Sequence, residues 1–329
     1  GYGTENIWVS TFHSTCVRIL RRYIEVLGYK RSFTIYDADD QRALMREIIK
    51  FLDLDPKKYK ERAFLNVISN AKDELIAPEE YAQRAQGDKM RETYARAYQE
   101  YEKRLRDANA LDFDDLICKT IQMFQENKDI LSYYQNRFRY IMVDEYQDTN
   151  TAQFKLISLM ACTPSEDGGV EHNLCVVGDD DQSIYKFRGA NIMNILNFEQ
   201  EYPDTRVIRL EENYRSTQNI LDAANAVIHN NTKRKEKALW TRKDKGDSIY
   251  YSQFENEYEE AEAVSSAIAR AVENGEASYK DFAVLYRTNA QSRVFEEKLI
   301  NYNIPYRIVG AVNFYQRKEI KDILAYLRT

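Results

Sequence analysis

Residues 138–150 read FRYIMVDEYQDTN, and this stretch decides the fold class. Phe138–Val143 is an almost unbroken apolar run, which is typical of a parallel-sheet strand buried on both faces. The run ends in two carboxylates, Asp144 and Glu145. Because α/β proteins bind ligands at the carboxyl ends of their strands, we expect this pair at a ligand-binding edge. Taken alone, the pattern also fits a strand that ends in a helix cap.

Strands and helices alternate from Phe113 onward, which indicates parallel sheets in two α/β domains. The predicted strands are Leu174–Val177, Arg206–Leu210, Ser248–Gln253, Phe282–Arg287 and Tyr306–Val309. The predicted helices are Phe113–Phe124, Ala152–Ala161, Asn191–Gln200, Thr217–His229, Glu257–Glu273, Gln291–Tyr302 and one that starts near Arg317. A polar loop is predicted at Thr163–His172.

A helical block dominates the N-terminal side. Asn6–Phe12 predicts a short buried strand, and His13–Leu27 predicts a basic amphipathic helix. From Lys30 to Asn109 the apolar spacing remains helical. The expected helix-start residues in this block are Asp37, Pro56 and Pro78. We therefore predict an inserted all-helical module whose two ends return to the first α/β domain.

Composition limits the class of protein. The 329 residues carry 47 Lys+Arg against 53 Asp+Glu, so any nucleic-acid surface has to be a local patch. Two stretches are basic, His13–Arg31 and Lys233–Lys245, although a solvated face is the simpler explanation of the second. No apolar run reaches membrane length and no signal-peptide pattern opens the chain. Scattered cysteines and few histidines favour a reduced, cytoplasmic protein without a zinc site.

A second polar stretch, GDDDQSIYKFRGA at residues 178–190, follows the strand predicted at Leu174–Val177. Its start therefore lies at the same sheet edge as Asp144. Gln182 can bond a phosphate or a water, and Tyr185 and Phe187 can present rings to bases with Arg188 beside them. The alternative is an acidic loop before a helix, with Phe187 packed in the core.

A third stretch, EENYRST at residues 211–217, closes another predicted strand and opens a helix. Arg215 at such an edge can form paired hydrogen bonds with a phosphate, and Tyr214 can stack on a purine. A helix cap at Ser216 or Thr217 beside a surface arginine would explain the stretch equally simply.

Together these stretches resemble motifs II, III and IV of the UvrD/PcrA/Rep family of superfamily 1 DNA helicases, nearest to its PcrA branch. Further matching segments are TFHS (11–14), LDFDDL (111–116), LYRTNAQSR (285–293), IPY (304–306) and RKEIKD (317–322). The resemblance runs along the whole chain. It implies RecA-like (P-loop NTPase type) parallel sheets in two domains with an all-helical inserted subdomain. The implied bounds are 1–30 and 110–212 for an incomplete domain 1A, 31–109 for subdomain 1B, and 213–329 for part of domain 2A.

The resemblance also implies an ATP-dependent 3′–5′ DNA helicase or translocase of repair and replication, with Mg²⁺ as the metal. By motif position, Asp144 would coordinate Mg²⁺ and Glu145 would be the general base. Gln182 and Arg215 would sense the γ-phosphate, and Tyr214 would stack on adenine. The residues implied for single-stranded and duplex DNA are Thr11, His13, Phe113, Tyr185, Phe187, Arg188, Arg287 and Asn289. Repair or replication proteins would be further partners.

Three features depart from the family pattern. Many relatives carry Trp where this chain has Phe187, which offers less stacking area. The loop Thr163–His172 is longer than usual. The chain contains no Gly-x-x-x-x-Gly-Lys-Ser/Thr sequence, and the family's arginine finger would lie beyond Thr329. The chain thus holds half of an ATPase site, and we expect the parent protein to be the enzyme and this chain alone to be inactive.

Other functions remain open at this stage. A helicase subunit of a nuclease-containing recombination complex would share the same motifs. The chain could instead act only as a single-stranded DNA-binding module. A metal phosphohydrolase site built from Asp144, Glu145 and Asp179–Asp181 is a third class, although no histidines lie nearby in the sequence.

Overall fold

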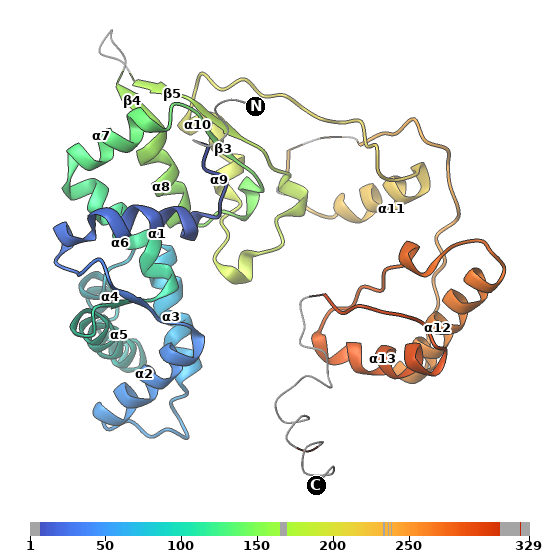
Figure 1. Ribbon diagram of the computed structural model, residues 1–329, viewed down its shortest axis with the longest axis horizontal. Helices are drawn as coiled ribbons and strands as arrows, with labels where there is room; N and C mark the ends of the chain where they lie inside the picture. The colour runs from blue at the N-terminus through green and yellow to red at the C-terminus, as the bar shows by residue number, and fades with distance from the viewer. Residues whose placement is uncertain are drawn as a thin grey trace. The chain divides into compact units, whose positions relative to one another are not determined.

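The computed structural model describes residues 7–164, 170–232, 234–235, 237, 239–309 and 323. The chain divides into two compact units, residues 1–243 and 244–329, and each is described by itself (Figure 1). The first unit contains the helices α1 (Phe12–Tyr23), α2 (Ala38–Phe51), α3 (Glu61–Asp73), α4 (Pro78–Arg84), α5 (Lys89–Asp107), α6 (Phe113–Glu126), α7 (Lys128–Arg137), α8 (Thr151–Ala161), α9 (Met193–Leu196), α10 (Phe198–Glu201) and α11 (Gln218–Ile228). Its strands are β1 (Thr34–Ile35), β2 (Ala110–Leu111), β3 (Ile141–Val143), β4 (Cys162–Pro164), β5 (Val170–His172) and β6 (Leu174–Val176). Its 3₁₀ turns are η2 (Ile24–Leu27), η3 (Tyr146–Asp148), η4 (Asp180–Gln182) and η5 (Lys186–Arg188).

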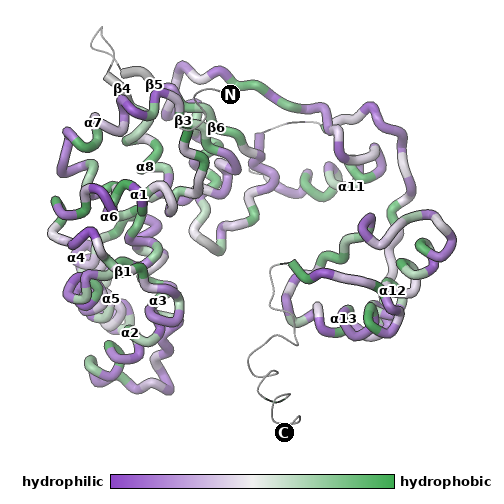
Figure 2. Tube along the Cα trace, in the orientation of Figure 1, coloured by the Kyte–Doolittle hydropathy of each residue, from purple (hydrophilic) through white to green (hydrophobic). Residues whose placement is uncertain are grey.

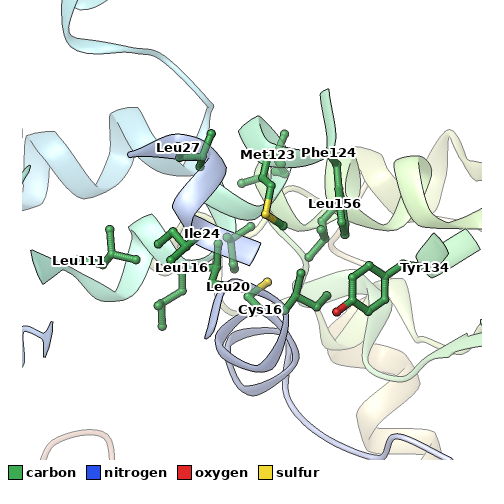
Figure 3. Close-up of a cluster of buried hydrophobic side chains, with 14 of the residues drawn as sticks. Cys16, Leu20, Ile24, Leu27, Leu111, Leu116, Met123, Phe124, Tyr134 and Leu156 are labelled. Atoms are coloured by element: carbon green, nitrogen blue, oxygen red, sulfur yellow. The ribbon is translucent and has the colours of Figure 1, made fainter. Parts of the chain in front are cut away.

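The main core of the first unit forms where α1, α7 and α8 pack against α6. Cys16 and Leu20 of α1 are buried against Leu116 of α6 and Leu156 of α8 (Figure 3). The helix predicted at His13–Leu27 is confirmed, and its last turn tightens to 3₁₀ geometry. The strand predicted at Asn6–Phe12 is wrong over its described part, because no ladder forms there and Val9 is 91% exposed.

The helical block α2–α5 packs around its own core. Met45, Phe64 and Tyr101 are fully buried there. Asp37 caps α2 and Pro78 opens α4, as predicted. Pro56 does not start a helix; the chain makes a turn there and α3 begins only at Glu61, so that prediction is wrong by several residues.

The two ends of the helical block are joined to each other. β1 and β2 pair in parallel, with Thr34 opposite Ala110 and Ile35 opposite Leu111. The backbone N–H of Lys30 also donates to Oδ1 of Asn109 at 2.7 Å. The points at which the chain enters and leaves the helical block are therefore adjacent. The predicted domain bounds themselves stay a prediction.

A small parallel sheet carries the motif loops. β3 pairs with β6, with Val143 opposite Val176 and Met142 opposite Cys175, and both strands are hydrophobic in Figure 2. Val143 is buried, whereas Met142 is 80% exposed. The predicted burial of this strand on both faces is therefore wrong in the described chain, because one face of the two-stranded ladder is uncovered.

Other predicted elements of the first unit differ in detail. The loop predicted at Thr163–His172 contains the antiparallel pair β4–β5, with Cys162 opposite His172. Helix Asn191–Gln200 is split into α9 and α10. Arg206–Leu210 forms no ladder in the described chain and Leu210 is exposed, so this strand prediction is not borne out.

The described part of the second unit, essentially residues 244–309, holds two α-helices and connecting segments. These elements are α12 (Glu257–Glu273), η6 (Tyr279–Asp281), η7 (Asn289–Gln291) and α13 (Ser292–Asn301). Both predicted helices are confirmed, and they bury Ile268 and Leu299 between them. The predicted strands 248–253, 282–287 and 306–309 form no ladder among the described residues. The helix expected near Arg317 lies outside the described residues. A second parallel sheet therefore stays a prediction.

Candidate functional site

Two carboxylates follow β3 directly. The side chains of Asp144 and Glu145 are both exposed, and the backbone N–H of Glu145 donates to Oδ1 of Asp144 at 2.9 Å. Glu145 has a left-handed backbone, with φ 50° and ψ 42°. Few residues with a Cβ adopt this region, and such strained positions cluster at functional sites. The strained turn directs the chain into η3.

The loop after β6 lies beside the loop after β3. The backbone N–H of Asp179 donates to Oε1 of Gln147 at 3.0 Å, and Nε2 of Gln147 donates to Oε2 of Glu145 at 2.7 Å. Nε2 of Gln182 donates to Oδ2 of Asp179 at 2.7 Å. A hydrogen-bonded path therefore connects Glu145 with Gln182. Sequence analysis missed Gln147, whose only signal was its place within a motif.

The acidic loop Asp179–Asp181 is neutralised by basic residues that follow α11. Arg234 binds Asp181 through two hydrogen bonds of 2.8 and 2.7 Å, and Nζ of Lys237 contacts Asp179 and Asp180. Burial opposes ionisation, but the hydrogen bonds from Lys237 and Arg234 outweigh it and hold the pKa values of Asp179 and Asp181 below their usual range. These described bases of the Lys233–Lys245 patch thus pair within the protein. The acids form ion pairs rather than a cluster open to a metal.

Tyr214 and Arg215 are exposed, and each forms a hydrogen bond with a residue two positions before it. The hydroxyl of Tyr214 donates to Oε2 of Glu212 at 3.0 Å, and the backbone N–H of Arg215 donates to Oδ1 of Asn213 at 2.9 Å. Nζ of Lys243 donates to the backbone oxygen of Arg215 at 2.8 Å. In the described chain these bonds do not link the two residues to Asp144 or Glu145, so a shared nucleotide site stays a proposal.

Aromatic candidates for DNA contact form two pairs. The rings of His13 and Phe113 lie 4.5 Å apart, and those of Tyr185 and Phe187 lie 5.9 Å apart. Thr11 caps α1, and His13 is the second residue of that helix. Phe187 is 70% exposed, which overturns the alternative that it packs in the core. The backbone of Arg188 closes η5, while its side chain lies outside the described part of the structure.

A cavity of about 450 Å³ is lined by one member of each pair, His13 and Phe187. His13 of α1, Asp114 of α6 and Phe187 line it together with Asp73 of α3 and Asn150. Burial, then repulsion from Asp114, raises the pKa of Asp73 to about 7. Burial lowers the pKa of His13, although Asp114 opposes that shift. The cavity is therefore mostly polar, with His13 and Phe187 as its aromatic lining residues.

The remaining DNA candidates lie in the second unit. Arg287 and Asn289 are both exposed. Asn289 opens η7, and its backbone oxygen accepts from Oγ of Ser292 at 2.9 Å. Their relation to the aromatic pairs stays a prediction.

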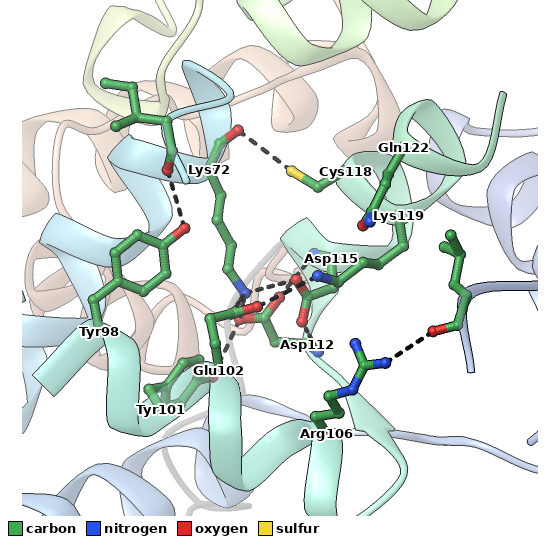
Figure 4. A network of polar contacts seen from close by, with 12 residues as sticks. Lys72, Tyr98, Tyr101, Glu102, Arg106, Asp112, Asp115, Cys118, Lys119 and Gln122 are labelled. Carbon is green, nitrogen blue, oxygen red and sulfur yellow. Dashed lines mark hydrogen bonds and ion pairs between the residues drawn. The ribbon is translucent and has the colours of Figure 1, made fainter. Parts of the chain in front are cut away.

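A buried ion-pair network, shown in Figure 4, joins the helical block to α6. Nζ of Lys72, on α3, lies 2.8 Å from Asp112, 2.8 Å from Asp115 and 2.6 Å from Glu102 of α5. Burial opposes the charge of Lys72, but the three carboxylates outweigh it and raise its pKa. Within the described residues these same acids are the group that converges closely enough to share an ion, and the ammonium of Lys72 lies among them. Sequence analysis gave no sign of Lys72 or Glu102.

Comparison with known proteins identifies the class. The model of the UvrD/REP helicase N-terminal domain matches residues 2–203, and that of the UvrD-like helicase C-terminal domain matches residues 208–329. The chain therefore belongs to the UvrD/REP helicase family, as its motifs predicted.

Individual relatives are similar over the whole chain. A Bacillus subtilis protein is 51% identical over 100% of the chain, which covers 43% of that relative. A Leuconostoc citreum protein is 51% identical over 98% of the chain, covering 42% of the relative, and a Staphylococcus aureus (strain NCTC 8325) protein is 50% identical over 100%, covering 44%. All three are named ATP-dependent DNA helicase PcrA. The chain thus spans less than half the length of these relatives. Among the residues that the structure describes, no helix has the length and apolar character needed to cross a membrane.

Proposed function

We propose that the protein containing this chain is an ATP-dependent DNA helicase or translocase. In this proposal it moves 3′ to 5′ on single-stranded DNA, unwinds duplexes in repair and replication, and works in the cytoplasm with ATP and Mg²⁺. Residues 1–30 and 110–212 would belong to domain 1A, 31–109 to subdomain 1B and 213–329 to domain 2A. The observation that carries the proposal is the hydrogen-bonded path from Glu145 to Gln182, in a chain similar to proteins named PcrA.

The residues at the strand ends suit nucleotide hydrolysis. The carboxylate of Asp144 supplies hard oxygen ligands of the kind that Mg²⁺ prefers, and the exposed Glu145 can accept a proton from a water. When bound, Mg²⁺ neutralises charge on the phosphates of ATP. Gln182 is held by Asp179 and would contact the γ-phosphate, as would Arg215. Tyr214 would stack on adenine.

The two aromatic pairs suit binding of single-stranded DNA. Tyr185, Phe187, Phe113 and His13 offer ring faces, on which bases stack with little dependence on sequence. In the proposal, Thr11, Arg188, Arg287 and Asn289 complete the contacts to the strand. Phosphate contacts would make binding weaken as salt rises.

The proposal is tested with Glu145→Gln in the full-length protein. The amide cannot take the proton from water, so kcat for DNA-stimulated ATP hydrolysis should fall roughly 10³-fold while ATP still binds. Glu126→Gln on the surface of α6 is the matched control and should keep normal turnover. Unwinding of a duplex with a 3′ tail, compared with one bearing a 5′ tail, tests the polarity. Near-normal hydrolysis by Glu145→Gln would remove Glu145 from its proposed role.

A further inference from the structure

Gln147 is a buried amide between the two motif loops. Gln147 is 1% exposed and lies within η3, two residues after Glu145. Its amide makes two hydrogen bonds in opposite directions, as donor to Oε2 of Glu145 and as acceptor from the backbone N–H of Asp179. Its backbone oxygen accepts from Oγ of Ser183 at 3.2 Å. Gln147 is thus hydrogen-bonded to residues of both the loop after β3 and the loop after β6.

The geometry leaves no freedom for this amide. A carboxylate accepts hydrogen bonds and a backbone N–H donates one, so the two partners fix which end of the amide faces which loop. Gly178 makes the approach possible, because a Cβ at that position would lie 2.6 Å from Oε1 of Gln147. The tight contact and the burial hold the Gln147 side chain in a single orientation.

We propose that Gln147 is a positioning residue for ATP hydrolysis. It orients the carboxylate of Glu145 and links that carboxylate to the loop that holds Gln182. The inference rests on the proposed role of Glu145 as the general base. An exposed glutamate on a left-handed turn would otherwise sample several rotamers. The bond from Gln147 engages Oε2 and so restricts the orientation in which the carboxylate can take a proton from water.

The same amide couples the two loops. Gln147 holds the backbone of Asp179, and the carboxylate of Asp179 holds Gln182. A displacement of Gln182 toward a phosphate therefore shifts the acceptor end of the Gln147 amide, and the donor end carries that shift to Glu145. Gln147 gives the base a direct connection to the state of the neighbouring loop.

The test is Gln147→Glu in the full-length protein. The new side chain keeps an acceptor for the N–H of Asp179 but places a second carboxylate against Glu145. We expect kcat for DNA-stimulated hydrolysis to fall about 10- to 100-fold, since small misplacements of a reacting group have effects of this size. KM for ATP should stay within about twofold.

Further variants separate positioning from folding. Gln147→Met has a similar shape and lacks both hydrogen bonds, so kcat should fall while KM for ATP stays within about twofold. Gln135→Glu is the matched control, because Gln135 is another buried amide and its Nε2 donates to the backbone oxygen of Leu159 at 2.8 Å. It should affect thermal stability alone.

The outcomes are distinct. If Glu145→Gln abolishes turnover while both Gln147 variants keep the kcat of the parent, the positioning role is wrong and the proposed function stands. If Gln147→Glu lowers only the melting temperature, as Gln135→Glu does, its role is structural and the inference is overturned. If Glu145→Gln itself hydrolyses ATP normally, the proposed function fails.

Discussion

Replacing Lys72 with Met should loosen the junction between the helical block and α6. Lys72 is 3% exposed, and its ammonium lies within 2.8 Å of three carboxylates. The substitution keeps most of the side-chain volume but leaves Asp112, Asp115 and Glu102 buried without their cation. Removing one partner from a buried ionic network costs about 3–5 kcal/mol. Because 1.4 kcal/mol is a factor of ten, local opening should become roughly 150- to 5,000-fold more frequent.

Hydrogen–deuterium exchange of the full-length protein measures this opening directly. Peptides from α3, α5 and α6 should exchange faster in Lys72→Met, whereas peptides from α12 and α13 should not change. Lys298→Met is the control, because Lys298 pairs with Glu262 at 2.7 Å on a partly exposed surface and such pairs contribute about 0–1 kcal/mol. Adding Glu102→Gln to Lys72→Met should restore part of the protection by removing one uncompensated charge. Unchanged exchange in the three helices of Lys72→Met would refute the ionic account of this junction.

Three further predictions concern DNA binding and pH. Phe187→Ala should weaken single-strand affinity roughly 5- to 150-fold in anisotropy titrations, with the salt slope and melting temperature unchanged because the ring is exposed; a lower melting temperature with unchanged affinity would contradict stacking. Arg287→Ala should flatten the salt slope by about one, and an unaltered slope would mean that it contacts no phosphate. The pKa of Asp73 is about 7 in the fold against 3.8 as the ordinary value, so its ionisation opposes folding as pH rises through this range. Asp73→Asn should therefore raise the melting temperature by about 2–4 °C near pH 8 and leave it unchanged near pH 4; an equal effect at both would exclude ionisation as the cause.

Local signals were predictable from the sequence because they depend on neighbouring residues. Asp37 caps α2 with the expected hydrogen bonds, and Pro78 opens α4. The placement of Asp144 and Gln182 at one sheet edge also followed from the order of strands and loops. Helix periodicity predicted α12 and α13 almost to the residue.

Contacts between distant segments could not be predicted in this way. The three carboxylates around Lys72 come from α5, from α6 and from Asp112, which caps α6, and no local pattern marks that lysine. The basic run after α11 suggested a DNA surface or a solvated face, but Arg234 and Lys237 bind the acids of another loop instead. Arg206–Leu210 has strand-like composition, yet a strand also needs a partner, which local composition does not specify.

The parallel pairing of β1 with β2 brings the two ends of the helical block together, so the block is an insertion in the chain. Neighbouring strands lie about 4.8 Å apart, so a short peptide is long enough to rejoin the chain across the point where it departs and returns. A deletion of the helical block would nevertheless leave buried charges unpaired. Lys72 would be removed with the block, while Asp112 and Asp115 would remain at the start of α6. Transplanting or trimming the block therefore requires neutral residues in place of those two acids. The backbone of the block is separable from the rest of the first unit, but its buried ion pairs are not.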